Sequence, residues 1–179
     1  MTGVGMNYAQ ALYSLAKEEG ADAQILSQLQ VLDEGFSREP DFLRLLAVPG
    51  LSKEERCGIL DSSFRDRVHP YVLNFMKLLT EKGYARYFGE CAKGYKQLYN
   101  EDHGIVSVCA VTAVDLSGQQ RQKLQQKLEQ IIGKQIELHT SVDDSCIGGI
   151  RLDYDGKRVD GTVKNRLDSI GKLLKNTVL

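Results

Sequence analysis

A change in hydrophobic period near Gly104 is the feature that most constrains how this chain can fold. Before it, apolar residues recur at i, i+3 or i+4, and i+7, which is the spacing of amphipathic helices. After it, the segment IVSVCAVTAV is β-branched and partly alternating, which is typical of a strand. The pattern therefore predicts two domains of different class, residues 1–104 and residues 105–179.

The first domain is predicted to be a bundle of about six helices. Three of the helices have a clear apolar stripe, formed by Tyr8, Leu12 and Leu15, by Ile25, Leu29, Leu32 and Phe36, and by Val72, Phe75, Met76 and Leu79. Ser52 and Glu55 are spaced as a capping box that begins a helix. Pro70 suits the first turn of the next helix, where its missing N–H costs little. No strand pattern interrupts these helices.

The second domain is predicted to have the order β-α-β-β-α, so the fold class of the chain is α+β. Ser117 and Gln120 form another capping box, and QIELHTSV alternates as a half-buried strand should. The dipeptide Asp155-Gly156 between two short strands indicates a type I′ hairpin. A last helix would bury the apolar side formed by Val163, Leu167, Ile170 and Leu174.

The stretch SCIGGIRLDYDGKRVDGTVKNRL, residues 145–167, is rich in glycine and invites comparison with a phosphate-binding loop. Such a loop leads straight into a helix, whereas Gly148 and Gly149 lead into a strand. The glycines instead favour a bulge or a close approach of two backbones. Asp160 or Thr162 suits the N-cap of the last helix, and Asp143 suits a turn or cap. The stretch is therefore expected to shape a protein surface.

Composition excludes several function classes. The net charge is -1, which does not favour nucleic-acid binding by the whole chain. Residues 1–104 contain 12 basic and 15 acidic residues, and residues 105–179 contain 11 and 9, so the two halves are expected to meet different partners. The sequence shows neither an apolar run of about 20 residues nor the start of a signal peptide, so no membrane insertion is expected.

Motifs of catalysis and metal binding are missing from the sequence. His69, His103 and His139 are far apart and outside any HExxH pattern, and the four cysteines form no CxxC pair. Walker A, GxGxxG and GxSxG patterns are also missing. We therefore expect no catalytic residue, no cofactor and no metal.

Four segments together resemble the delta subunit of bacterial F-type ATP synthase, whose mitochondrial counterpart is the oligomycin-sensitivity-conferring protein. They are YAQALYSLAKEEG, FLRLLAVPGLSKEER, LNFMKLLTEKG and the long C-terminal stretch SVDDSCIGGIRLDYDGKRVDGTVKNRLDSIGKLL. The last is the most specific, with a signature formed by Asp143, Gly148, Gly149, Asp155, Gly156, Asp160, Gly161, Arg166 and Leu167. Tyr84, Asp144 and Thr162 depart from the usual Arg, Pro and Ser of the family.

The resemblance implies a non-catalytic stator subunit that links the catalytic head to the peripheral stalk. It would act as one copy in a hetero-oligomeric complex, on the cytoplasmic face of the cell membrane. The first domain would hold a helix of an alpha subunit against the residues Tyr8, Ala11, Leu12, Leu15, Asn74, Lys77 and Leu78. The second would bind b-type stalk subunits, with polar contacts from Lys164 and Arg166.

Three other functions remain open from the residues alone. A helical adaptor could bind an amphipathic peptide helix in another complex. A small enzyme could use a site that no motif reveals. An RNA-binding protein could use the basic residues of the last helix, although no aromatic side chains interleave with them.

Overall fold

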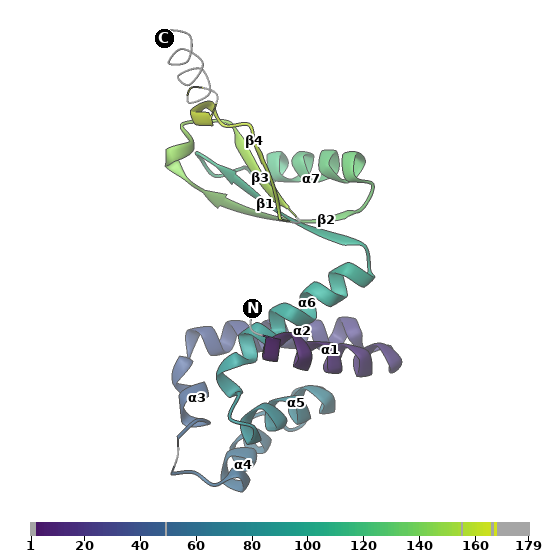
Figure 1. The fold of residues 1–179 in the computed structure, drawn as a ribbon, viewed down its shortest axis with the longest axis vertical. Helices are drawn as coiled ribbons and strands as arrows, with labels where there is room; N and C mark the ends of the chain where they lie inside the picture. Colours follow the sequence, from purple (N-terminus) through teal and green to yellow (C-terminus); the bar gives the residue numbers. More distant parts are fainter. Residues whose placement is uncertain (1–2, 49, 155, 166, 168–179) are drawn as a thin grey trace. The chain divides into compact units, whose positions relative to one another are not determined.

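The computed structural model describes residues 3–48, 50–154, 156–165 and 167, and the chain divides into two compact units (Figure 1). The helical unit comprises residues 1–99 and the C-terminal unit residues 100–179. The sequence analysis places the boundary a few residues later, where the hydrophobic period changes. Helix α6 runs from Phe88 to Asp102, and so the division falls in its last turn.

The helical unit contains the helices α1 (Gly3–Glu18), α2 (Asp22–Arg38), α3 (Pro40–Leu45), α4 (Lys53–Phe64), α5 (Pro70–Glu81) and most of α6, with the short 3-10 helix η1 (Ala85–Tyr87) before α6. The predicted capping box is present, because Ser52 and Glu55 each accept the other's backbone N–H. Pro70 occupies the first turn of α5, as predicted.

Apolar stripes meet in one core in this unit. The stripes predicted for α2 and α5 are buried throughout. Phe36 packs edge-to-face against Phe88, with ring centroids 5.0 Å apart. The fully buried Tyr95 donates its hydroxyl hydrogen to the Asp22 carbonyl at 3.0 Å. Because its polar end is satisfied, this ring can fill the core without an unpaired hydroxyl.

In the described residues of the C-terminal unit, a four-stranded sheet carries helix α7 on one face. Its elements are β1 (Ile105–Thr112), α7 (Gly118–Ile132), β2 (Gln135–Val142), η2 (Asp144–Cys146), β3 (Ile150–Tyr154) and β4 (Lys157–Asp160). The strand order is β2-β1-β3-β4, with β1 and β2 parallel and the other pairs antiparallel. Val108, Leu128 and Ile136 form the core between the sheet and α7. The predicted order β-α-β-β is thus confirmed.

The last predicted helix is described only at its start. Residues 163–165 and residue 167 are helical, while Arg166, Ile170 and Leu174 lie outside the described residues. The capping box at Ser117 and Gln120 begins α7 as predicted. The hairpin between β3 and β4 is also confirmed, with Gly156 at a φ of 70°. Asp155, its predicted partner in the turn, lies outside the described residues.

The two adjacent glycines of the signature have different roles. Gly149 has a φ of 82°, and a Cβ there would lie 2.6 Å from the Gly161 carbonyl oxygen. This is the close backbone approach that the sequence predicts. At Gly148 the prediction of a close backbone approach is wrong, because a Cβ there would meet only Val163 Cγ2, at an ordinary contact distance of 3.5 Å.

This difference predicts that Gly149→Ala destabilises the chain and Gly148→Ala does not. The first change adds both positive-φ strain and a backbone collision, and should lower the free energy of unfolding by roughly 2 kcal/mol or more. The second should change it by less than about 0.5 kcal/mol. Urea denaturation of the full chain, followed by the transition of the sheet, measures both. Equal stability of the two variants would contradict the role given to Gly149.

Candidate interfaces for partner helices

Helices α1 and α5 lie side by side and run antiparallel. Two contacts fix this arrangement at opposite ends of the pair. The Tyr71 hydroxyl at the start of α5 donates to Glu19 Oε1, just past the end of α1, at 3.2 Å. Near the start of α1, the ring of Tyr8 meets the ring of Tyr84, which follows α5, at a centroid distance of 6.0 Å. These two contacts therefore define which residues of α1 lie opposite which residues of α5.

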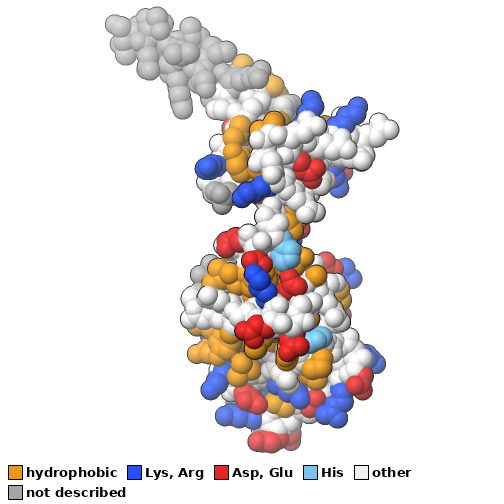
Figure 2. Space-filling model, turned by 90° about the vertical axis from the view of Figure 1, so that its right-hand side faces the viewer, with side chains coloured by type: hydrophobic (Ala, Val, Ile, Leu, Met, Phe, Trp, Pro, Cys, Tyr) orange, Lys and Arg blue, Asp and Glu red, His pale blue; other side chains and the backbone are white. Residues whose placement is uncertain are grey.

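A partly apolar surface lies between those two contacts. Leu15 on α1 and Leu78 on α5 are 48% and 41% exposed, which is high for leucine. Ala11 and Asn74 are also exposed, and Tyr8 is half-buried. We call these five residues, Tyr8, Ala11, Leu15, Asn74 and Leu78, the α1/α5 surface. Figure 2 shows that apolar side chains reach the exterior of the helical unit between charged ones.

Two residues predicted for this surface lie elsewhere. Leu12 is only 4% exposed and belongs to the core, because it shares the inner side of α1 with Ala9 and Ala16. Lys77 faces α4, where its Nζ lies 2.7 Å from Asp61 Oδ1. This contact lowers the pKa of the Asp61 carboxyl. Lys77 therefore joins α4 to α5 and is turned away from α1.

An aromatic cluster closes one end of the α1/α5 surface. Tyr84 packs edge-to-face against both Tyr8 and Tyr87. The Arg86 guanidinium lies over the Tyr87 ring, 4.7 Å from its centroid. The Tyr84 ring thus supplies packing at a position where the family resemblance implies an arginine.

In the C-terminal unit, the signature residues form a chain of local hydrogen bonds. Asp143 caps η2 by accepting the Ser145 N–H at 3.0 Å. Hydrogen bonds from the side chain and then the backbone of Ser145 lower the pKa of the Asp143 carboxyl. Thr162 is the cap of the last helix, since its Oγ1 accepts the Asn165 N–H at 3.3 Å. Asp160 holds that cap in place by accepting the Thr162 hydroxyl at 2.7 Å. The choice left open between Asp160 and Thr162 is thus decided.

Ile147 has an unusual backbone in this region. Its φ is 64° and its ψ is -38°, and the Gly148 N–H donates to the Cys146 carbonyl at 2.7 Å. These values describe a γ-turn of the rare, strained type with a β-branched residue at its centre. The side chain is nevertheless 66% exposed, so burial does not compensate for the strain. Strain of this kind is often kept where a side chain must be presented to a partner.

Two further exposed apolar residues lie at the start of the last helix, which is bonded to the γ-turn. The Val163 N–H donates to the Gly148 carbonyl at 3.0 Å, which brings the last helix against the γ-turn. Val163 is 40% exposed and Leu167, one helical turn later, is 55% exposed. We call Ile147, Val163 and Leu167 the C-terminal patch. The sequence analysis did not single out Ile147 as an exposed apolar residue, because the glycines that follow it indicate only a feature of the backbone.

Lys164, predicted to contact the stalk, is exposed next to the C-terminal patch. Its charge contributes to the lowered pKa of Asp143, after the bonds from Ser145 and the effect of Arg151. The other predicted cation, Arg166, lies outside the described residues.

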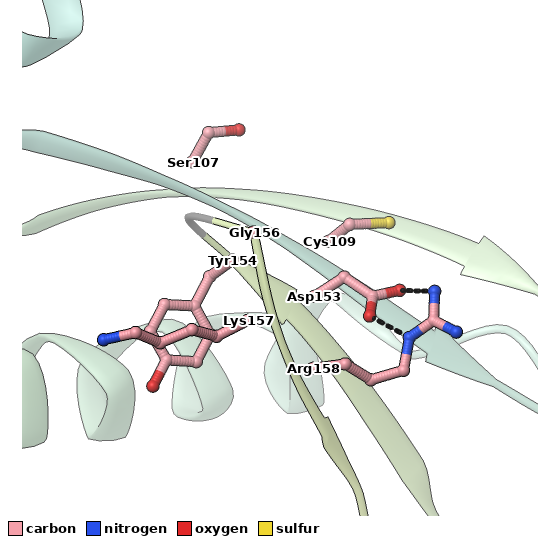
Figure 3. Close-up of a pocket in the computed structure, with 7 residues that line it drawn as sticks. All are labelled: Ser107, Cys109, Asp153, Tyr154, Gly156, Lys157 and Arg158. Atoms are coloured by element: carbon pink, nitrogen blue, oxygen red, sulfur yellow. Dashed lines mark hydrogen bonds and ion pairs between the residues drawn. The ribbon is translucent and has the colours of Figure 1, made fainter.

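A hollow of about 530 Å³ in the C-terminal unit lies on β1, β3 and β4 (Figure 3). Its carboxylate, Asp153, accepts two bonds from the Arg158 guanidinium, at 2.6 and 3.4 Å. This pairing lowers the pKa of Asp153 and keeps it ionised at neutral pH. Ser107 and Cys109 line the same hollow. A carboxylate held by arginine in this way is a poor general base, so the geometry does not favour catalysis.

Among the described residues, no group of three or more His, Cys, Asp or Glu side chains could hold a metal ion. The helices of that part of the chain are also too short or too polar to cross a membrane.

Comparison with known proteins decides the family. The family described as "ATP synthase delta (OSCP) subunit" matches residues 4–174. The chain belongs to this family. It is 34% identical to the ATP synthase subunit delta of Alkaliphilus oremlandii, over 98% of each chain. It is 31% identical to the subunit delta of Desulforamulus reducens, over 97% of each.

The fold agrees with that membership. A chain of the Toxoplasma gondii mitochondrial ATP synthase hexamer superposes with a TM-score of 0.77 over 97% of this chain and 98% of that one, at 19% identity. As a delta-family protein, the chain is a structural subunit of F-type ATP synthase and a stator component of the peripheral stalk. The alternative of a helical adaptor in another complex finds no support.

Proposed function

We propose that this delta-family chain ties the catalytic head to the peripheral stalk through two separate surfaces, without any catalysis of its own. The α1/α5 surface would bind the N-terminal helix of an alpha subunit. The C-terminal patch would bind the ends of b-type stalk subunits. One copy would act in each synthase, on the cytoplasmic face of the cell membrane. The observation that carries the proposal is that each unit exposes its own group of apolar side chains.

The α1/α5 surface has the features of a groove for a helix. A docked helix is held by apolar anchors at i, i+3 or i+4, and i+7, and it needs a place where its backbone can approach. Leu15 and Leu78 offer apolar contacts from the two sides, and both are more than 40% exposed. Between Tyr8 and Leu15, Ala11 presents only a methyl group. The small side chain leaves room for the partner's backbone.

The C-terminal patch suits a partner that is apolar at its centre and acidic at its edge. Its three side chains are between 40% and 66% exposed. The exposed Lys164 stands beside them on the last helix. Apolar anchors would supply most of the affinity, while the cation would set register and rate of association. Ile147 is the central anchor, because the γ-turn already holds it in the bound position.

A subunit that joins the catalytic head to the peripheral stalk needs high affinity and stiffness, and it does not need a catalytic site. The head experiences torque as the rotor turns, and ATP synthesis requires that the head not follow it. The capped helices and the close contact of Gly149 with Gly161 give each unit a fixed shape. Binding to a preorganised surface loses little affinity to ordering.

The proposal for the head predicts that Ala11→Glu weakens binding of the alpha-subunit peptide. A carboxylate would replace the methyl group at the closest approach and would be desolvated on binding. We expect the dissociation constant to rise at least about tenfold, which corresponds to ~1.4 kcal/mol. Isothermal titration of the full chain with a synthetic alpha N-terminal peptide measures this.

Gln10→Glu is the matched control for this experiment. Gln10 is the neighbouring exposed residue on α1, and the change adds the same charge away from α5. The affinity of the Gln10→Glu variant for the peptide should stay within about twofold of the wild-type value. If Ala11→Glu stays folded by circular dichroism and binds as tightly as the control, the assignment of the α1/α5 surface is wrong.

The proposal for the stalk predicts that Ile147→Asp weakens binding of the soluble domain of the b-type subunits. The change removes the central apolar anchor and adds a charge that would be buried in the complex. We expect a loss of affinity of about tenfold or more by surface plasmon resonance on the full chain. The control is Ile131→Asp, an isoleucine of the same unit that is 80% exposed on α7. Similar losses in both variants would contradict a specific role for the C-terminal patch.

A further inference from the structure

The two edges of the C-terminal sheet are built differently. The edge strand β4 has only four residues, which are all exposed and include Lys157 and Arg158. Short, charged edge strands of this kind discourage pairing with another chain. At the other edge, β2 has eight residues, with no proline, lysine or arginine among them. β2 therefore lacks the usual protection of an edge strand.

Alternate residues of β2 turn their backbone groups toward β1 and away from it. The Asp143 N–H, one residue past the strand, donates to the Thr112 carbonyl of β1 at 2.8 Å. The odd-numbered residues of β2 therefore face β1. The backbone N–H and C=O groups that point to the outer edge are those of Ile136, Leu138, Thr140 and Val142.

Side chains of α7 cover this outer edge at Ile136. The Gln125 amide donates to the Ile136 carbonyl at 2.9 Å, and the Ile136 N–H donates to Glu129 Oε1 at 3.4 Å. Gln125 also donates to the same Glu129 oxygen, at 3.2 Å. The two side chains thus bond both backbone groups of one residue, as a neighbouring strand would. These bonds confirm that the even-numbered residues of β2 face outward.

Beyond Ile136, the outward backbone groups have no hydrogen-bond partner among the described residues. Leu138, Thr140 and Val142 offer these groups in a row that repeats about every 7 Å along the strand. Another extended backbone matches such a row, and this is how peptides add a strand to a sheet edge. Val142 is 52% exposed, so the open stretch is accessible at its end.

The side chains beside the open edge define what an added strand should carry. Leu138 packs against the core between the sheet and α7, so Val142 lies on that same face. Glu137 and His139 lie on the opposite face, with His139 Nε2 3.5 Å from Glu137 Oε1. A strand of alternating apolar and polar residues fits both faces, because its apolar side chains would lie beside Leu138 and Val142.

The open edge leads to the C-terminal patch. Thr112 of β1 pairs with both Val142 and Ile150, so β2 finishes and β3 starts at the same end of the sheet. Ile147, a residue of the patch, lies in the short connection between these two strands. A chain that binds the patch therefore has the end of β2 close by.

We infer that an extended segment of the b-type stalk subunits pairs with the outer edge of β2 and continues the sheet. The inference rests on the proposed function, because it needs the stalk at the C-terminal patch. Three residues offer few backbone bonds, so the added strand depends on the neighbouring apolar anchors for affinity. In return, the backbone bonds fix the register of the stalk, and attachment at two adjoining places resists rotation about either one.

Amide hydrogen exchange tests the added strand. It is measured on the ¹⁵N-labelled full chain, alone and with the soluble domain of the b-type subunits from the same synthase. In the free chain, the amides of Leu138, Thr140 and Val142 should exchange quickly, whereas the bonded amide of Ile136 should be protected. In the complex, exchange at the three open positions should slow by about tenfold or more.

The outcomes separate the inference from the proposed function. Unchanged exchange at the three open positions, in a complex that forms, overturns the inference and leaves the stalk assignment intact. An absence of binding to the wild-type chain contradicts the proposed function itself.

Other occupants of the edge would give different patterns of exchange. Protection of the three amides that rises with the concentration of the free chain would indicate pairing with a second copy. Protection at every concentration of the free chain would indicate that the chain covers the edge itself. Either result overturns the inference.

A proline in the open stretch gives a second readout. Thr140→Pro removes an outward N–H and obstructs the edge, at the kind of position where edge strands tolerate proline. Thr140→Ala is the matched control, because it removes the same hydroxyl and keeps the N–H. Surface plasmon resonance should show that Thr140→Pro binds the soluble domain about fivefold or more weakly than Thr140→Ala.

Urea denaturation checks that both Thr140 variants are folded. Equal affinities of the two folded variants would overturn the inference. If Thr140→Pro does not fold, the exchange rates of the wild-type chain decide the question alone.

Discussion

Close packing of α1 through small residues is the constraint on which the helical unit depends. Ala9 and Ala16 are fully buried, and a Cβ at Gly5 would lie 3.0 Å from Glu90 Cβ. Larger side chains on this inner stripe would move α1 outward. Three of the five buried positions of α1 are therefore small, and these let the helix pack closely beside Leu12 and Tyr13. This close packing helps to bring the two sides of the α1/α5 surface together.

A comparable constraint acts in the C-terminal unit. The Gly149 backbone approaches Gly161, and the Gly161 N–H donates to the Ile150 carbonyl at 3.0 Å. These contacts fix where the last helix starts relative to β3. The γ-turn at Ile147 immediately precedes this contact. Its backbone is strained, and the Ile147 side chain is exposed to solvent. In both units, therefore, tight backbone packing in one place positions apolar side chains in another.

Much of the fold could be predicted from local signals. Capping boxes at Ser52 and Ser117, the proline at the start of α5 and the change of period after α6 each depend on neighbours close in sequence. Such signals do not need tertiary information, and for this reason they predict where α4, α5 and α7 begin.

The surfaces were harder to predict, because a stripe does not reveal which flank of a helix stays exposed. Leu12 and Leu15 belong to the same periodic pattern, yet one is core and the other is surface. Lys77 turns toward α4 because Asp61 is there, a partner that helical spacing within α5 cannot reveal. The γ-turn at Ile147 lies beside an approach between Gly149 and the distant Gly161, which no local pattern reveals. The resemblance to a family predicts the function, and the structure shows which of the predicted residues are exposed at the surface.

The central claim is that one chain carries both surfaces and that the tie fails if they are separated. Proton-driven ATP synthesis by vesicles containing a synthase stripped of this subunit tests it most directly. Wild-type chain should restore synthesis. An equimolar mixture of a variant that has lost only the α1/α5 surface and a variant that has lost only the C-terminal patch should not, because no single molecule would then join head to stalk. Full restoration by the mixture would contradict the account.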